Sequence, residues 1–251
     1  MIKKISYVML ALLVAITSAQ AAGGGPELKE KAHNNIRSKE SLRSGAQTYM
    51  DFCFGCHSMA YQRYNRVAQD LELTEDEMMN NLVPPGAKFS DKMEISMDQE
   101  QAKQGEWFSK AKAPDLTVIA KARGVDWLFN YLLSFYADES RPTGWNNTVY
   151  TNSMPHVLWE LQGIQKANFT TETGEDGLEH QVFQGFEMVQ EGSLSPEEYK
   201  NLMRDLVNFL DYSSEPAKLI RLSYAPWVLA FLAFFTFMAY LLKLNYFRDI
   251  H

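Results

Sequence analysis

The sequence predicts a mainly α-helical body, interrupted by loops and one β-hairpin, with a single transmembrane helix at its C-terminus. Three observations lead to this fold class. Two stretches, near residues 41–53 and 195–210, place apolar or small residues three and four positions apart, as in helices with one buried face. Residues 222–242 carry no charge, as expected of a membrane span. Finally, β-type residues flank the turn sequence "TGEDG" at 173–177.

The N-terminus predicts a secretory signal peptide over residues 1–22. Lys3 and Lys4 precede an apolar run at 5–16, and Ala19 and Ala21 are spaced as in a cleavage site. The segment lacks the Arg-rich and Ser-rich composition of a mitochondrial transit peptide, which favours a bacterial chain. An uncleaved anchor helix is the alternative, but the run is too short to span ~30 Å of hydrocarbon comfortably.

The segment "SLRSGAQTYMDFCFGCH" predicts a helix that runs into a cysteine motif, with the helical region as a whole covering residues 41–68. Gly45, Tyr49 and Cys53 follow one another at steps of four and therefore share one face. Because glycine has no side chain, we expect a second helix to approach closely at Gly45, with the Tyr49 ring packed beside the crossing.

Cys53, Cys56 and His57 form a C-x-x-C-H motif, and the chain has no other cysteine. A disulfide or a redox dithiol does not need the histidine, and a zinc site needs a second Cys/His pair that this chain lacks. C-x-x-C-H is the attachment signature of c-type haem. In that interpretation each thiol forms a thioether to the haem, and His57 is the proximal iron ligand.

The middle of the chain predicts an irregular excursion, a helix and a hairpin. Residues 70–112 are charged and punctuated by proline and glycine, so they are expected on the surface. Residues 115–137 are expected to be helical, and the segment around "TGEDG" to form the hairpin.

A second helix is expected from residue 195 onward. Ser195 is placed as its N-cap, Pro196 at its first position, and Glu198 three residues after the cap, which together predict a capping box. Its apolar stripe would pack against the first helix. The stripe consists of Tyr199, Leu202, Met203, Leu206, Val207 and Leu210.

The uncharged run at 222–242 has 21 residues, which as a helix at ~1.5 Å per residue matches the hydrocarbon core of a bilayer. A buried core helix is the alternative, but cores rarely contain so long an uncharged run. We therefore predict a transmembrane helix at 222–243, a body at 23–221 and a tail at 244–251. Lys243 and Arg248 favour a cytoplasmic tail, which places the body in the periplasm.

The body at 23–221 holds 20 basic and 30 acidic residues, a net charge of −10. Nucleic acid is an unsuitable partner for such a surface, whereas a protein with a basic face would be attracted to it. Glu72, Glu75, Asp76 and Glu77 could contribute to such attraction. The alternative is that the acidic excess serves solubility only.

Electron transfer by a haem iron calls for a sixth ligand, and methionine opposite histidine raises the reduction potential. Met154 ranks first because it lies in a polar loop that Pro155 fixes. His156 and His180 remain alternatives that would give a lower potential. The other methionines after the motif rank lower: Met59, Met78, Met79, Met93, Met97, Met188 and Met203.

Three segments, together with the C-terminal helix, resemble the cytochrome c1 family, the haem subunits of the cytochrome bc1 complex. They are "CFGCHSMAYQRYNRV", "APDLTVIAKARGVDWLFNYL" and "SMPHVLWELQG". The resemblance covers nearly the whole mature chain and is closest to proteobacterial members. It implies a class I cytochrome c core carrying one covalent haem c.

The resemblance also implies roles for individual residues. Met154 lies in the segment that supplies the family's axial ligand. Arg123 matches an arginine that contacts a haem propionate, and Trp127 stands where an aromatic residue assists in some members. The carbonyl of Pro114 would accept a hydrogen bond from the proximal His57, as in soluble cytochromes c.

The function implied is electron transfer in ubiquinol:cytochrome c oxidoreductase. The chain would receive electrons from the Rieske iron–sulfur subunit, assemble with cytochrome b, and reduce a soluble or membrane-bound cytochrome c. Alone it would not be an enzyme, and its location would be the bacterial inner membrane. A free-standing, membrane-tethered electron shuttle is the alternative.

Overall fold

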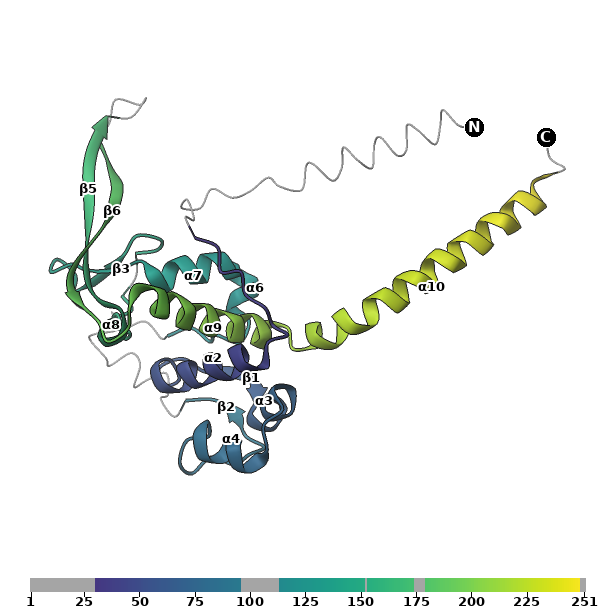
Figure 1. Cartoon of the computed structure of the whole chain (residues 1–251), viewed down its shortest axis with the longest axis horizontal. Helices are drawn as coiled ribbons and strands as arrows, with labels where there is room; N and C mark the ends of the chain where they lie inside the picture. The colour runs from purple at the N-terminus through teal and green to yellow at the C-terminus, as the bar shows by residue number, and fades with distance from the viewer. Residues whose placement is uncertain (1–29, 96–112, 152, 174–178, 249–251) are drawn as a thin grey trace.

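The computed structural model describes residues 30–95, 113–151, 153–173 and 179–248 (Figure 1). The signal peptide predicted at 1–22 lies outside these residues. The described helices are α2 (Lys39–Phe52), α3 (Tyr64–Leu71), α4 (Glu75–Asn81), α6 (Ile119–Arg123), α7 (Val125–Leu133), α8 (Trp159–Gln162), α9 (Pro196–Ser214) and α10 (Ala217–Tyr246). The described strands are β1 (Met59–Arg63), β2 (Lys92–Met93), β3 (Phe135–Ala137), β4 (Trp145–Asn147), β5 (Gly163–Thr173) and β6 (Glu179–Glu191). The predicted class, mainly α with a hairpin insertion and one C-terminal apolar helix, is confirmed.

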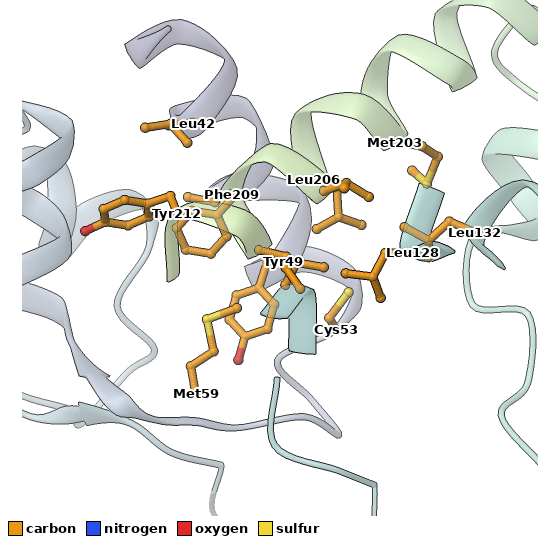
Figure 2. Packing of buried hydrophobic residues seen from close by; sticks show 14 of the residues in the cluster. Leu42, Tyr49, Cys53, Met59, Leu128, Leu132, Met203, Leu206, Phe209 and Tyr212 are labelled. Carbon is orange, nitrogen blue, oxygen red and sulfur yellow. The ribbon is translucent and has the colours of Figure 1, made fainter. Parts of the chain in front are cut away.

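Helices α2 and α9 cross at the centre of the body, and the crossing occurs at Gly45. A Cβ atom at this position would lie only 2.1 Å from the carbonyl oxygen of Asp205, so no larger residue fits without moving a helix. One turn later the ring of Tyr49 packs on that of Phe209, with centroids 5.9 Å apart. Figure 2 shows Tyr49 and Phe209 together in the buried cluster, with Cys53 close by. The expected close approach at Gly45 is confirmed.

Helix α9 begins with the predicted capping box. The Ser195 hydroxyl accepts from the backbone N–H of Glu198, and the Glu198 carboxylate accepts from the backbone N–H of Ser195. Each interaction satisfies an N–H that the first helical turn would otherwise leave unpaired. The predicted stripe faces the core, with Leu202 half-buried and the other five residues buried.

Two predicted helices are divided in the structure. The helix expected at 115–137 is split into α6 and α7, because Gly124 adopts φ +92° and breaks the helical path. Its last three residues form strand β3 instead. Glycine tolerates the positive φ found at Gly124 because it has no Cβ atom.

The helical region expected to continue through residue 68 is interrupted after the cysteine motif by β1, which pairs with β2.

The excursion at 70–112 contributes to the core as well as to the surface. Helix α4 begins with a second capping box, formed by Thr74 and Glu77. Met78 on this helix and Met93 on β2 are buried among the apolar residues of the body. Residues 96–112 lie outside the described part of the chain.

Strands β5 and β6 form the predicted antiparallel hairpin, which extends away from the helical body (Figure 1). Its register runs from Gly163 opposite Glu191 to Thr173 opposite Glu179. The expected turn falls mostly on residues 174–178, which are not described. At its base, the Gln165 side chain donates to the carbonyls of Leu133 and Phe135, which attaches the hairpin to the body.

Helix α10 projects from the body (Figure 1) and is long and apolar enough to cross a membrane. At ~1.5 Å per residue its 30 residues exceed the hydrocarbon thickness, so its first turn can lie outside the bilayer. Glu215, just before this turn, forms ion pairs of 2.7 Å with Lys121 on α6 and with Arg221 on α10. These pairs link the body to the base of the helix.

Candidate haem site

A cavity of about 470 Å³ opens between the cysteine motif, the 113–119 segment, α6, α7, the loop after β4 and α9. Its wall is largely apolar, with Leu116, Ile119, Leu128, Leu206 and Leu210 among the lining residues. Six of the seven predicted site residues line it: Cys53, His57, Pro114, Arg123, Trp127 and Met154. Cys56 belongs to the same turn as Cys53 and His57 but does not line the cavity.

The cysteine motif forms a tight turn at the end of α2. The backbone N–H groups of Cys56 and His57 both donate to the carbonyl of Cys53, at 3.1 and 2.9 Å. The buried Tyr49 hydroxyl donates to the carbonyl of His57 at 2.7 Å. The first helix therefore determines both where the motif begins and where its last residue lies.

Burial makes the two thiols poor thiolates. It raises the pKa of Cys53 to about 12, with a smaller contribution from nearby Cys56, and it also raises the pKa of Cys56. A thioether carries no charge, so it is compatible with this buried environment.

His57 Nδ1 donates a hydrogen bond to the carbonyl oxygen of Pro114 at 2.7 Å. The Pro114 segment is held beside the motif by two further bonds. The Asp115 carboxylate accepts from the N–H of Ala60 at 2.7 Å, and the N–H of Leu116 donates to the carbonyl of Ser58 at 2.9 Å. Burial lowers the pKa of His57, opposed by the Pro114 hydrogen bond and by the charge of Asp115. A neutral imidazole that donates from Nδ1 keeps its Nε2 lone pair for a metal.

Met154 lies in the loop between β4 and α8, half-buried in the cavity wall. The Tyr131 hydroxyl on α7 donates to its sulfur at 3.3 Å. The lower-ranked methionines lie elsewhere: Met59, Met78, Met93 and Met203 are buried in the core, and Met188 on β6 is 44% exposed. Met79 does not line the cavity, and Met97 is outside the described residues.

Neither alternative histidine lines the cavity. The His156 ring is 2% exposed and stacks on Phe135, with centroids 4.9 Å apart. Burial lowers the pKa of His156 to about 4, partly offset by a hydrogen bond with Gln162. His180 lies on the exposed outer part of β6. Met154 is thus the described thioether that shares a cavity with His57.

Arg123 and Trp127 lie side by side on the cavity wall. The Arg123 guanidinium is 5.2 Å from the ring centroids of both Trp127 and Tyr150, so two aromatic faces hold the cation. A cation held in this way beside an apolar cavity suits a ligand that has a large apolar body and an anionic edge. A neutral imidazole, a thioether, two suitably spaced thiols and this cation together fit haem c.

Three residues that the sequence analysis did not single out help to shape the site. Asp115 ties the Pro114 segment to the motif, and the Tyr150 ring covers Arg123. Tyr131 contacts Met154. One signal for Tyr131 was present in the sequence, because it follows Trp127 by four positions and must share its helix face. Tyr150 lies in an irregular loop and carried no such signal.

The fold and the site define a membrane-anchored c-type cytochrome. A family model described as the Cytochrome C1 family matches residues 31–250. The chain therefore belongs to the cytochrome c1 family, whose members carry one covalently bound haem c, and Cys53 and Cys56 occupy the cysteine positions of the attachment motif.

The curated relatives include cytochromes c1 and one protein that carries another name. The chain is 42% identical to the cytochrome c1 of Allochromatium vinosum over 241 residues, which is 96% of each chain. It is 38% identical over 250 residues to a Nitrosomonas europaea protein named ammonia monooxygenase gamma subunit, covering 99% of this chain and 100% of that one. The mitochondrial cytochrome c1 haem protein of Saccharomyces cerevisiae is 27% identical over 193 residues, 70% of this chain and 56% of that one.

Proposed function

We propose that this chain is the haem c subunit of a bacterial cytochrome bc1 complex. In this role it carries electrons from the Rieske iron–sulfur subunit to a soluble or membrane-bound cytochrome c, and it assembles with cytochrome b. The observation that carries the proposal is that His57, with Nδ1 committed to Pro114, and Met154 line one apolar cavity beside a C-x-x-C-H turn.

When bound, haem c supplies a one-electron carrier whose potential the protein adjusts. Cys53 and Cys56 would hold it through thioethers, and His57 Nε2 and Met154 Sδ would bind its iron. The Pro114 carbonyl keeps the His57 ring in one tautomer and orientation. Arg123 would pair with the anionic propionate edge, and the indole N–H of Trp127 would donate a hydrogen bond to it. The leucine side chains that line the cavity would exclude water from the bound group.

The proposed topology follows from the two ends of the chain. A cleaved signal peptide at 1–22 exports the body at 23–221 to the periplasm, and the C-terminal span anchors it in the inner membrane. Lys243 and Arg248 then mark the cytoplasmic side, because basic residues are retained there. The isolated chain is assigned no bond-making step. It acts as one component of ubiquinol:cytochrome c oxidoreductase.

The decisive test is purification of the tagged full-length chain from native membranes in mild detergent, followed by identification of the proteins that accompany it. Cytochrome b and a Rieske protein should co-purify in equal amounts, and ubiquinol should reduce the haem of the purified complex. A haem protein that purifies alone would favour the tethered shuttle and contradict the proposal. Monooxygenase subunits in place of cytochrome b would also contradict it, and the name of the Nitrosomonas europaea relative makes that outcome worth testing.

A further inference from the structure

The Tyr131 hydroxyl is aimed at the sulfur of Met154. It donates to Sδ at 3.3 Å, and both side chains line the same cavity as His57. A thioether sulfur is a weak acceptor with two lone pairs. In general, a thioether that accepts one hydrogen bond can still coordinate a metal through its second lone pair, so a donor such as Tyr131 is compatible with ligation by Met154.

The Tyr131 ring is fixed by its neighbours. It is 7% exposed and stacks on Trp127, with centroids 5.2 Å apart and planes inclined by 7°. The Tyr131 ring also meets Phe135 edge-on, with centroids 5.0 Å apart and planes inclined by 72°. A ring packed between two aromatic side chains has little freedom to rotate, so packing determines where its hydroxyl points.

The loop that leads to Met154 is attached to the same residue through the backbone. The Asn147 side chain, which is 3% exposed, donates from Nδ2 to the carbonyl of Tyr131 at 2.8 Å. Its Oδ1 accepts from the N–H groups of Val149 and Tyr150, at 2.9 and 3.2 Å. The start of the loop that leads to Met154 is therefore held beside Tyr131.

A hydrogen bond to a ligand sulfur changes how well that sulfur donates electrons. The hydroxyl proton withdraws electron density, so the thioether donates less to iron. Ferric iron depends on this donation more than ferrous iron does, and the reduced form is favoured. Outer hydrogen bonds of this kind orient metal ligands and adjust reduction potentials in many metal sites.

We propose that Tyr131 is the positioning residue for the axial methionine: its hydroxyl fixes the orientation of the Met154 sulfur and raises the reduction potential of the haem. This inference rests on the proposed ligation of iron by Met154. Tyr131 thereby helps to set the reduction potential at which the complex delivers its electron.

The test is Tyr131→Phe in the intact membrane complex, which removes the hydroxyl and keeps the ring between Trp127 and Phe135. Redox titration should show a lower midpoint potential. The net contribution of one hydrogen bond corresponds to about a two- to tenfold change in the equilibrium constant for reduction. For the transfer of one electron, a tenfold change shifts the midpoint potential by about 59 mV. The matched control is Tyr199→Phe, which also removes a buried hydroxyl, but one that donates to the Leu132 carbonyl at 3.1 Å. The control should leave the potential unchanged.

The absorption band of thioether-ligated ferric haem separates failure of this proposal from failure of the ligation. A Tyr131→Phe protein that keeps the band with an unchanged potential overturns the role of Tyr131 alone. A wild-type protein without the band overturns the Met154 ligation, and with it this inference. If Tyr131→Phe does not fold, 3-fluorotyrosine in place of Tyr131 keeps the ring and strengthens the donor. It should raise the potential, and an unchanged value would contradict the proposal.

Discussion

His57 Nδ1 and the carbonyl oxygen of Pro114 lie 2.7 Å apart, although 57 positions separate the two residues in the chain. A carbonyl can only accept, so the imidazole must donate from Nδ1 and keep its lone pair on Nε2. The hydrogen bond thereby selects one tautomer of the proposed proximal ligand before any metal is considered.

The haem should be covalently bound through Cys53 and Cys56. Acid–acetone extraction of the purified protein should leave the haem on the polypeptide, because thioether bonds survive this treatment. The double variant Cys53→Ala/Cys56→Ala should lose haem staining on a denaturing gel. Free extraction of haem from the wild-type protein would contradict covalent attachment.

Met154→Leu should abolish the thioether-to-iron absorption band of the ferric protein and lower the midpoint potential, because leucine has no donor atom. Met188→Leu, on the exposed part of β6, is the matched control and should preserve both. If Met154→Leu retains the band, the sixth ligand is another residue.

Gly45→Ala should destabilise the body by about 1–3 kcal/mol, the usual effect of overpacking. The new Cβ would meet the Asp205 carbonyl oxygen at 2.1 Å and Phe209 Cβ at 2.8 Å. Denaturant unfolding of the haem-loaded protein, followed by loss of the haem spectrum, measures the change. Ser44→Ala on the same helix should have a small effect, and equal stability of the two variants would mean that the α2–α9 crossing adjusts freely.

The ion pairs of Glu215 should make the base of α10 sensitive to acid. The hydrogen bond from Lys121, followed by the charges of Arg221, Lys121 and Lys218, lowers the pKa of Glu215 from its ordinary value of 4.5. The carboxylate is therefore favoured in the folded state. Its contribution is fully present above the ordinary pKa and is lost as the pH falls through the lowered value.

Glu215→Gln should consequently lower the melting temperature at pH 7 and have a vanishing effect below the folded-state pKa. Melting curves of variant and wild type from pH 7 to pH 3 measure this difference. Glu187→Gln, on the exposed face of β6, is the control. A constant difference across the whole range would show that Glu215 acts through packing and not through charge.

Reduction of the acceptor should slow as ionic strength rises, because the body carries a net charge of −10. Steering between exposed charges weakens once the Debye length falls to ~10 Å at ~0.1 M salt. Glu75 and Asp76 on α4 do not line the cavity, so they would act through the field around the protein.

The variant Glu75→Gln/Asp76→Asn should therefore lower the second-order rate at low salt and have little effect at high salt. Glu187→Gln/Glu191→Gln on the hairpin serves as its control. A rate that does not change with salt would mean that the acidic excess serves solubility, or that the acceptor stays bound.

Features that are encoded within a few neighbouring residues could be predicted from the sequence. The C-x-x-C-H turn, the capping box of Ser195 and Glu198, and the apolar run of α10 are each complete within one segment. Gly45 and Tyr49 could also be interpreted correctly, since steps of four on a helix place residues on one face. The order of the segments was enough to indicate the family, and with it the roles proposed for Pro114, Arg123 and Met154.

Other features were decided only when distant segments packed together. Gly124 divided a predicted helix, because its unusual backbone angle allows α6 and α7 to follow different directions. Several methionines were compatible with a ligand role by type, and burial in the core removed Met78, Met93 and Met203 from the cavity. The contact of Tyr131 with Met154 depends on a loop, a helix and an asparagine side chain meeting in one place. Sequence patterns act over a turn or two of helix. Side-chain hydrogen bonds between distant segments, in contrast, depend on distances to within fractions of an ångström. Only the packing of the core positions distant segments with that precision.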